Sequence, residues 1–172
     1  MSVIDLARTL PDHAKDIRLN MSSLMGETLL SEQQKYGTLV ASAHATGYRP
    51  LIEAAEAEAS AKLGEAAMTA AKAAASIMAM NNVYYRFMHL AANKEYATLP
   101  ARLRMNVIGA PGIEKLDFEI FSLAVSAING CGICIDAHEK VIREHGVQTI
   151  VIQAAVRLAS VVQAMAASLR AL

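Results

Sequence analysis

The sequence has no net charge. Its 172 residues include 16 lysines and arginines and 16 aspartates and glutamates, so the formal charges cancel. Proteins that bind nucleic acids through the phosphate backbone usually carry an excess of basic residues. The balance of charges therefore argues against a nucleic-acid partner. A neutral, alanine-rich chain also suits a protein that buries part of its surface in an oligomer.

The sequence also lacks a secretory leader and an uninterrupted hydrophobic run. Residues 1–10 contain Asp5 and Arg8, which leave no apolar core of the length that a signal peptide needs. The most apolar stretch, residues 147–172, is interrupted by Arg157, Arg170 and several glutamines, so we do not expect it to span a membrane. These features predict a cytoplasmic protein that does not associate with a membrane.

Alternating strand patterns are missing as well, and the length fits a single domain over residues 1–172. Apolar residues recur instead at helical spacing, and the predicted fold class is all-α. Helices are expected within residues 1–20, with a break near Pro11, and then over 31–46, 51–63, 65–89, 101–108, 115–128, 131–145 and from 148 onwards.

Two parts of the chain, about 36–89 and 115–170, resemble each other when shifted by 84 residues. For example, Leu39 and Ser42 fall on Leu123 and Ser126. Helix lengths and breaks match as well, which predicts two pseudo-repeated helical halves. Small residues often align by chance in an alanine-rich chain, so a chance match is the alternative interpretation. In this alignment Gly47 and Pro50 occupy the places of the cysteines.

Cysteine is scarce, and both copies fall in one motif. Cys131 and Cys134 form a Cys-x-x-Cys pair, and His138 follows four residues later. In a helix these three residues share one face. In a reducing cytosol such a pair is more often catalytic or metal-binding than structural. A structural disulfide would close only a tiny loop, and a zinc site would need a fourth ligand or a catalytic water.

The spacing allows either cysteine to be the attacking thiolate. Cys131 lies near the helix N-terminus, whose partial positive charge favours an anion. Cys134 lies one turn before His138, which can accept its proton. Glu119, flanked by apolar residues in the preceding helix, is the best candidate to orient that imidazole. A thiolate oxidised by a peroxide becomes a sulfenic acid, and the second cysteine then closes a disulfide. The residues thus predict a thiol peroxidase or a thiol–disulfide oxidoreductase.

The other histidines and the methionine-rich segment are not expected to carry chemistry. The remaining histidines show no metal-ligand spacing, and the methionines of residues 68–88 are interpreted as core packing. We therefore predict no bound metal and no bound cofactor.

Several segments resemble the alkyl hydroperoxide reductase AhpD family. They are residues 80–86 (Met-Asn-Asn-Val-Tyr-Tyr-Arg), 104–108, 111–113, 118–119 and 122–131, followed by Cys134 and 137–139. The Cys-x-x-Cys-x-x-x-His element alone is shared with the wider carboxymuconolactone decarboxylase-like superfamily. The flanking segments make the similarity to AhpD more specific.

This resemblance implies an all-helical homotrimer with two related halves. It implies an antioxidant enzyme that reduces organic hydroperoxides and regenerates the peroxiredoxin AhpC. The implied reductant is the dihydrolipoyl group of a 2-oxoacid dehydrogenase component. By the family pattern, Cys134 forms the sulfenic acid, Cys131 donates a proton and resolves the intermediate as the redox disulfide, and Glu119 and His138 form the proton relay. A non-peroxidatic electron carrier and a decarboxylase-like enzyme on the same fold are the alternatives.

The chain departs from the family at one position. Some members have a histidine directly before the second cysteine, and this sequence has Ile133 there. An added imidazole could assist proton transfer. We therefore expect Ile133→His to raise peroxidase turnover, measured at saturating dithiol. An unchanged rate in a folded variant would contradict this expectation.

Overall fold

The computed structural model describes residues 1–172 and contains helices but no strands. The elements are α1 (Val3–Arg8), η1 (Asp12–Ala14), α2 (Lys15–Gly26), α3 (Glu32–Thr46), α4 (Arg49–Ala59), α5 (Glu65–Leu90), η2 (Lys94–Thr98), α6 (Asn106–Gly109), α7 (Lys115–Asn129), α8 (Gly132–Glu144) and α9 (Thr149–Arg170). The all-α prediction is therefore confirmed.

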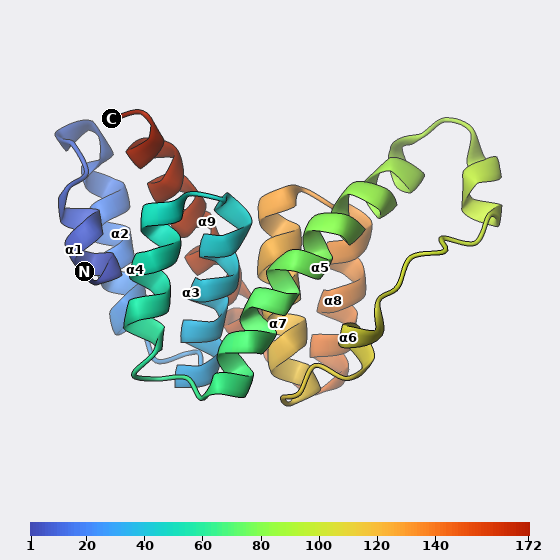
Figure 1. Cartoon of the computed structure of the whole chain (residues 1–172), viewed down its shortest axis with the longest axis horizontal. Helices are drawn as coiled ribbons and strands as arrows, with labels where there is room; N and C mark the ends of the chain where they lie inside the picture. The colour runs from blue at the N-terminus through green and yellow to red at the C-terminus, as the bar shows by residue number, and fades with distance from the viewer.

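Helices α3 and α7 form the centre of the molecule (Figure 1). They pack against each other, and both also pack against α5 and α9. Helix α4 completes the layer on the α3 side, and α8 completes it on the α7 side. The buried apolar side chains of both sides join in one continuous core, because the two central helices are buried on nearly all faces.

Local sequence signals explain where the central helices begin and end. Ser31 caps α3. Its hydroxyl accepts a hydrogen bond from the backbone N–H of Gln34, and the side-chain oxygen of Gln34 accepts one from the backbone N–H of Ser31. Gly47 and Gly130 end α3 and α7 with the same φ of 67°, in the left-handed region that glycine adopts without steric cost. The turn at Gly130 leads directly into the cysteine motif.

Three predicted helical segments have different bounds in the structure. The N-terminal segment, expected within residues 1–20, extends through α2 to Gly26. Residues 101–108 were expected to be helical, but only Asn106–Gly109 are. Arg102 has a φ of 53°, which interrupts a right-handed helix, and Pro111 disfavours helix in the residue before it. The helix expected over 51–63 covers Arg49–Ala59, because Pro50 is compatible with the first turn of a helix.

The helix bounds bear on the predicted repeat, which stays a prediction. Helices α3 and α7 each have 15 residues, and their cap glycines are 83 positions apart. Helices α5 and α9 begin 84 positions apart. By helix position, Tyr48 and not Gly47 corresponds to Cys131, since both are N-caps. Leu51 then takes the place of Cys134.

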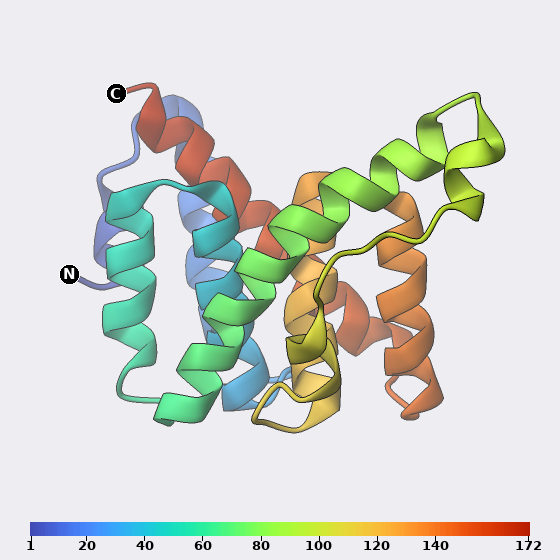
Figure 2. The same cartoon turned by 45° about the vertical axis from the view of Figure 1, so that its right-hand side comes forward.

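The end of α5 and the following η2 project from the helical body, and the chain returns as an extended strap to α6 (Figure 2). The rings of Phe87 and Tyr96, whose centroids are 5.1 Å apart, hold η2 against α5. We call residues 83–99 the arm. It carries five exposed large apolar side chains, which are Val83, Phe87, Leu90, Tyr96 and Leu99.

Helix α9 corrects one expectation about the apolar C-terminal stretch. By length and composition alone, Thr149–Arg170 is long and apolar enough to cross a membrane, in spite of its polar interruptions. Half of its most apolar window is buried, and the helix packs against α2, α3 and α7. A core helix of a globular protein passes the same test, so this property is weak evidence for a membrane span.

The contact between α3 and α7 leaves no room for a side chain at Gly37. A Cβ atom there would lie 2.0 Å from Cζ of Phe121, a side chain with no exposed surface. We expect Gly37→Ala to lower the free energy of unfolding by roughly 1–2 kcal/mol, because overpacking outweighs the better helix propensity of alanine. Urea denaturation measures the change.

Gly26→Ala is the matched control for this prediction. Gly26 also belongs to a helix, but a Cβ atom there meets nothing within 4 Å. Its stability should stay the same or rise slightly. Equal stability of the two variants would contradict the packing argument.

Candidate active site

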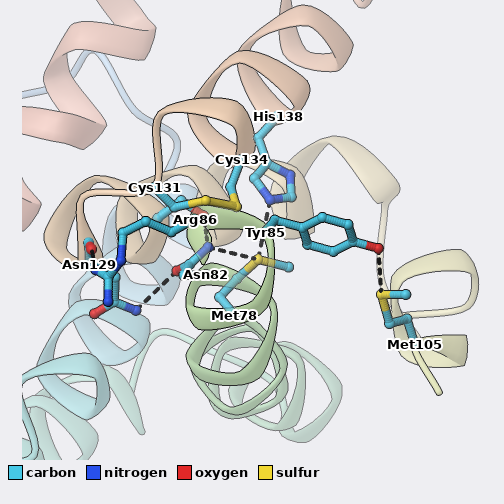
Figure 3. Close-up of a disulfide and its surroundings, with 10 residues drawn as sticks. Met78, Asn82, Tyr85, Arg86, Met105, Asn129, Cys131, Cys134 and His138 are labelled. Carbon is cyan, nitrogen blue, oxygen red and sulfur yellow. Dashed lines mark hydrogen bonds between the residues drawn. A yellow bond between two sulfur atoms is a disulfide. The ribbon is translucent and has the colours of Figure 1, made fainter. Parts of the chain in front are cut away.

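The cysteine motif lies where α7 turns into α8. Cys131 is the N-cap of α8, and Cys134 is in the first turn of that helix. The free amides of a helix N-terminus favour a negative charge, so both sulfur atoms lie where a thiolate is stabilised. Figure 3 shows the two sulfur atoms joined as a disulfide. The Cα atoms of the two cysteines are 5.3 Å apart.

The two sulfurs differ in their access to solvent. Cys131 has no exposed surface, while Cys134 is 6% exposed and lines a cavity. A small molecule entering that cavity therefore meets Cys134. Burial of Cys131 behind it leaves that residue in position for an internal reaction with its neighbour.

Helix α7 contributes the carboxylate and α8 the imidazole of a buried pair. Nδ1 of His138 lies 2.6 Å from Oε2 of Glu119, and both residues are less than one-tenth exposed. Burying either group alone would carry a large desolvation cost, which the short hydrogen bond offsets. When the carboxylate accepts the Nδ1 proton, Nε2 is the nitrogen left to exchange a proton in the site.

Helix α5 supplies the opposite wall of the site. Nε2 of His138 lies 3.2 Å from the Sδ atom of Met78 (Figure 3). Met78 was interpreted from the sequence as core packing only, and this interpretation was incomplete. It is buried in the core and also contacts the imidazole. Nothing in the spacing of the methionines distinguishes it from its neighbours.

A polar network beneath the disulfide was also missed. Asn82, on α5, donates to the Ser126 hydroxyl at 2.9 Å and accepts from Asn129 at 3.0 Å. Arg86 donates to the backbone oxygen of Asn129. These bonds attach the end of α7 to α5, directly before Cys131, as Figure 3 shows for Asn82, Arg86 and Asn129. Residues 80–86 carried only the family resemblance in the sequence, without a stated role.

The cavity in front of Cys134 has a volume of about 320 Å³ and is mainly apolar. Three elements form it, namely α5, the α6 region and α8. The residues that line it are Met78, Asn81, Tyr85, Met105, Ile108, Ile133, Cys134, Ala137 and His138. Its size and lining suit a small ligand with an apolar body. Ile133, where some family members have histidine, is part of this wall.

A second cavity, of about 350 Å³, borders Asn82, Arg86 and Asn129 from the other side, and neither cysteine lines it. His44, at its edge, forms another histidine–carboxylate pair, 2.6 Å from Glu56. Burial raises the pKa of Glu56, but hydrogen bonds from Lys72 and His44 outweigh this effect, so the pKa lies below its usual value. Unlike the His138–Glu119 pair, this pair has no thiol beside it.

The side chains around the motif do not form a metal site. No three His, Cys, Asp or Glu residues converge as metal ligands anywhere in the chain. In the disulfide form, the two sulfurs are bonded to each other, and His138 is engaged with Glu119 and Met78. The arrangement is suited to proton transfer beside a dithiol.

Comparison with known proteins agrees with this geometry. The model of the carboxymuconolactone decarboxylase family matches residues 94–172, which include both cysteines, Glu119 and His138. A protein of Rhizorhabdus wittichii named alkyl hydroperoxide reductase AhpD is 64% identical over 96% of each chain. Proteins of the same name from Maricaulis maris and Hyphomonas neptunium are 59% and 61% identical over 99% of this chain.

The chain belongs to the AhpD family. The match extends along nearly the whole length of these relatives, so it includes α1–α6 as well as the motif. The family resemblance inferred from residues 80–86 and 104–139 is therefore confirmed. The individual roles of the four site residues stay predictions.

Proposed function

We propose that this protein is an antioxidant alkyl hydroperoxide reductase that uses the Cys131–Cys134 pair. The observation that carries this proposal is the position of Cys134, which lines an apolar cavity beside the buried His138–Glu119 pair. An apolar cavity favours organic hydroperoxides as substrates, because their hydrocarbon part gains from burial. The names of the relatives support the same activity.

In the proposed reaction Cys134 is the nucleophile. His138 takes the proton of the Cys134 thiol, and Glu119 stabilises the resulting imidazolium. The thiolate attacks the terminal oxygen of the hydroperoxide, so an S–O bond forms and the O–O bond breaks. Cys134 becomes a sulfenic acid, and the alkoxide takes a proton from Cys131 to leave as the alcohol.

Cys131 then resolves the intermediate. Its thiolate attacks the Cys134 sulfur, the S–S bond forms, and hydroxide leaves with the proton from His138 as water. The sum is one hydroperoxide and two thiols converted to an alcohol, water and a disulfide. No bound cofactor or metal takes part.

The return to the dithiol needs an external reductant. We assign this role to a dihydrolipoyl group carried by a 2-oxoacid dehydrogenase component, and we expect the reduced protein to regenerate the peroxiredoxin AhpC. Both partners follow from the family resemblance. Repeated reduction of the disulfide fits a cytoplasmic location, where thiols are kept reduced.

A homotrimer is the proposed assembly. Exposed apolar side chains on the arm support burial against other copies of the chain. Val83, Phe87 and Leu90 recur at i, i+4 and i+7 on one face of α5, and the ring of Tyr96 contacts Phe87. The trimeric number itself comes from the family resemblance.

A lipoamide-dependent peroxidase assay tests the proposal. With cumene hydroperoxide and dihydrolipoamide, Cys134→Ser should reduce turnover at least about a thousandfold, to the uncatalysed background, because the attacking thiolate is lost. His44→Gln is the control, since it alters the histidine–carboxylate pair that has no thiol, and it should keep its activity.

Two other results would contradict the proposal. Peroxidase activity in Cys134→Ser equal to that of the wild type would exclude the thiol mechanism. A decarboxylase-like enzyme on the same fold would instead keep its own activity after both cysteines are replaced by serine. If the reduced wild-type protein transferred electrons to a peroxiredoxin but was not itself oxidised by hydroperoxide, the protein would be an electron carrier.

A further inference from the structure

One buried polar side chain in the cavity has no partner. Asn81 is only 5% exposed, and its Oδ1 atom is buried without any hydrogen bond. A buried amide oxygen without a partner destabilises the fold relative to one that accepts a hydrogen bond. A group of this kind gains a hydrogen bond from any water or ligand that can donate to it.

Asn81 faces the cavity that contains Cys134. It lies on α5 between Met78 and Tyr85, at positions i, i+3 and i+7, and all three line the cavity. The carboxamide thus belongs to the same wall as Met78, which contacts the imidazole of His138. A molecule bound in this cavity therefore contacts both the Asn81 side chain and Cys134.

The neighbouring polar groups cannot satisfy this amide. In the neutral imidazole of His138, Nδ1–H donates to Glu119, and Nε2, which lies 3.2 Å from Sδ of Met78, has no proton to donate to Asn81. The hydroxyl of Tyr85 lies 3.9 Å from the Sδ atom of Met105. The rest of the lining is apolar, so the carboxamide of Asn81 is the one unengaged polar side chain in the wall.

We propose that Asn81 binds the hydroperoxyl group of the substrate, an inference that rests on the proposed function. A hydroperoxide combines an apolar body with one O–H donor, which matches an apolar cavity with one free acceptor. The O–H donates to Oδ1, and the amide group can donate to the second oxygen. Asn81 is then a substrate-binding residue of this site.

This contact acts on the bond that breaks. As the Cys134 thiolate forms the S–O bond, the O–O electron pair moves to the alkoxide oxygen, which gains negative charge. A hydrogen bond from the carboxamide to that oxygen is stronger in the transition state than in the ground state, and it therefore increases the rate. The proton that completes the alcohol comes from Cys131, as above.

The test compares two electrophiles in a Cys131→Ser background, where Cys134 is the only thiol. Cumene hydroperoxide offers Asn81 an O–H donor and a leaving oxygen that gains charge, whereas iodomethane alkylates the same thiolate and has neither. We expect Asn81→Leu to slow reaction with cumene hydroperoxide at least about tenfold. Its alkylation by iodomethane should keep the parent rate.

Tm measurements and a control variant at a second unpartnered amide distinguish an effect on substrate binding from an effect on folding. Asn81→Leu is close in shape and removes an unsatisfied polar group, so its Tm should be unchanged or higher. Alanine is too small to clash with the cavity lining, so Asn81→Ala should also react more slowly with cumene hydroperoxide only. Gln163→Met is the control, because Oε1 of Gln163 is also buried without a partner but lies outside the cavity. It should react with both reagents at the parent rates.

Equal rates of Asn81→Leu and its parent with cumene hydroperoxide would overturn the assignment of Asn81. A parallel loss with both reagents would also overturn it, because Asn81 would then act on the thiol and not on the substrate. If the reduced wild-type protein, with both cysteines and Asn81 intact, does not react with cumene hydroperoxide, the proposed function itself fails. The two failures are thus distinguishable.

Discussion

The hydrogen bond between Glu119 and His138 is the interaction on which the arrangement of the site depends. It joins α7 to α8 in the interior, where burying a carboxylate or an imidazole without a hydrogen-bond partner carries a desolvation cost. The two helices are connected only by the short turn at Gly130. A turn of this length sets the distance between the helices, and the buried bond sets their rotation. Together they direct Cys134 toward the cavity and keep Cys131 behind it.

Helix α5 completes the site from a distant part of the chain. One of its faces presents Met78 and Asn81 to the cavity, and the adjacent position Asn82 holds the end of α7 through Ser126 and Asn129. The same helix therefore both closes the cavity and supports the turn before the thiol pair. This double role explains why the site lies at the contact of α5, α7 and α8 and not on α8 alone.

Much of the fold could be predicted from the sequence, because its signals are local. The Ser31 capping box and the glycines after α3 and α7 define helix ends within a few residues. The prediction failed at residues 101–108, where the left-handed conformation of Arg102 has no signature in an arginine side chain. Glu119 could be named because its apolar neighbours marked it as buried and because α7 directly precedes the motif. Met78, Asn81 and Asn82 could not, since their contacts depend on how α5 crosses the other helices.

The central claim is that Cys134 is the thiol that a hydroperoxide oxidises. The most direct measurement treats each single-cysteine variant with one equivalent of cumene hydroperoxide, traps sulfenic acid with dimedone, and locates the adduct by mass spectrometry. The account predicts an adduct on Cys134 in Cys131→Ser and none on Cys131 in Cys134→Ser. An adduct on Cys131, or equal adducts in both variants, would contradict it.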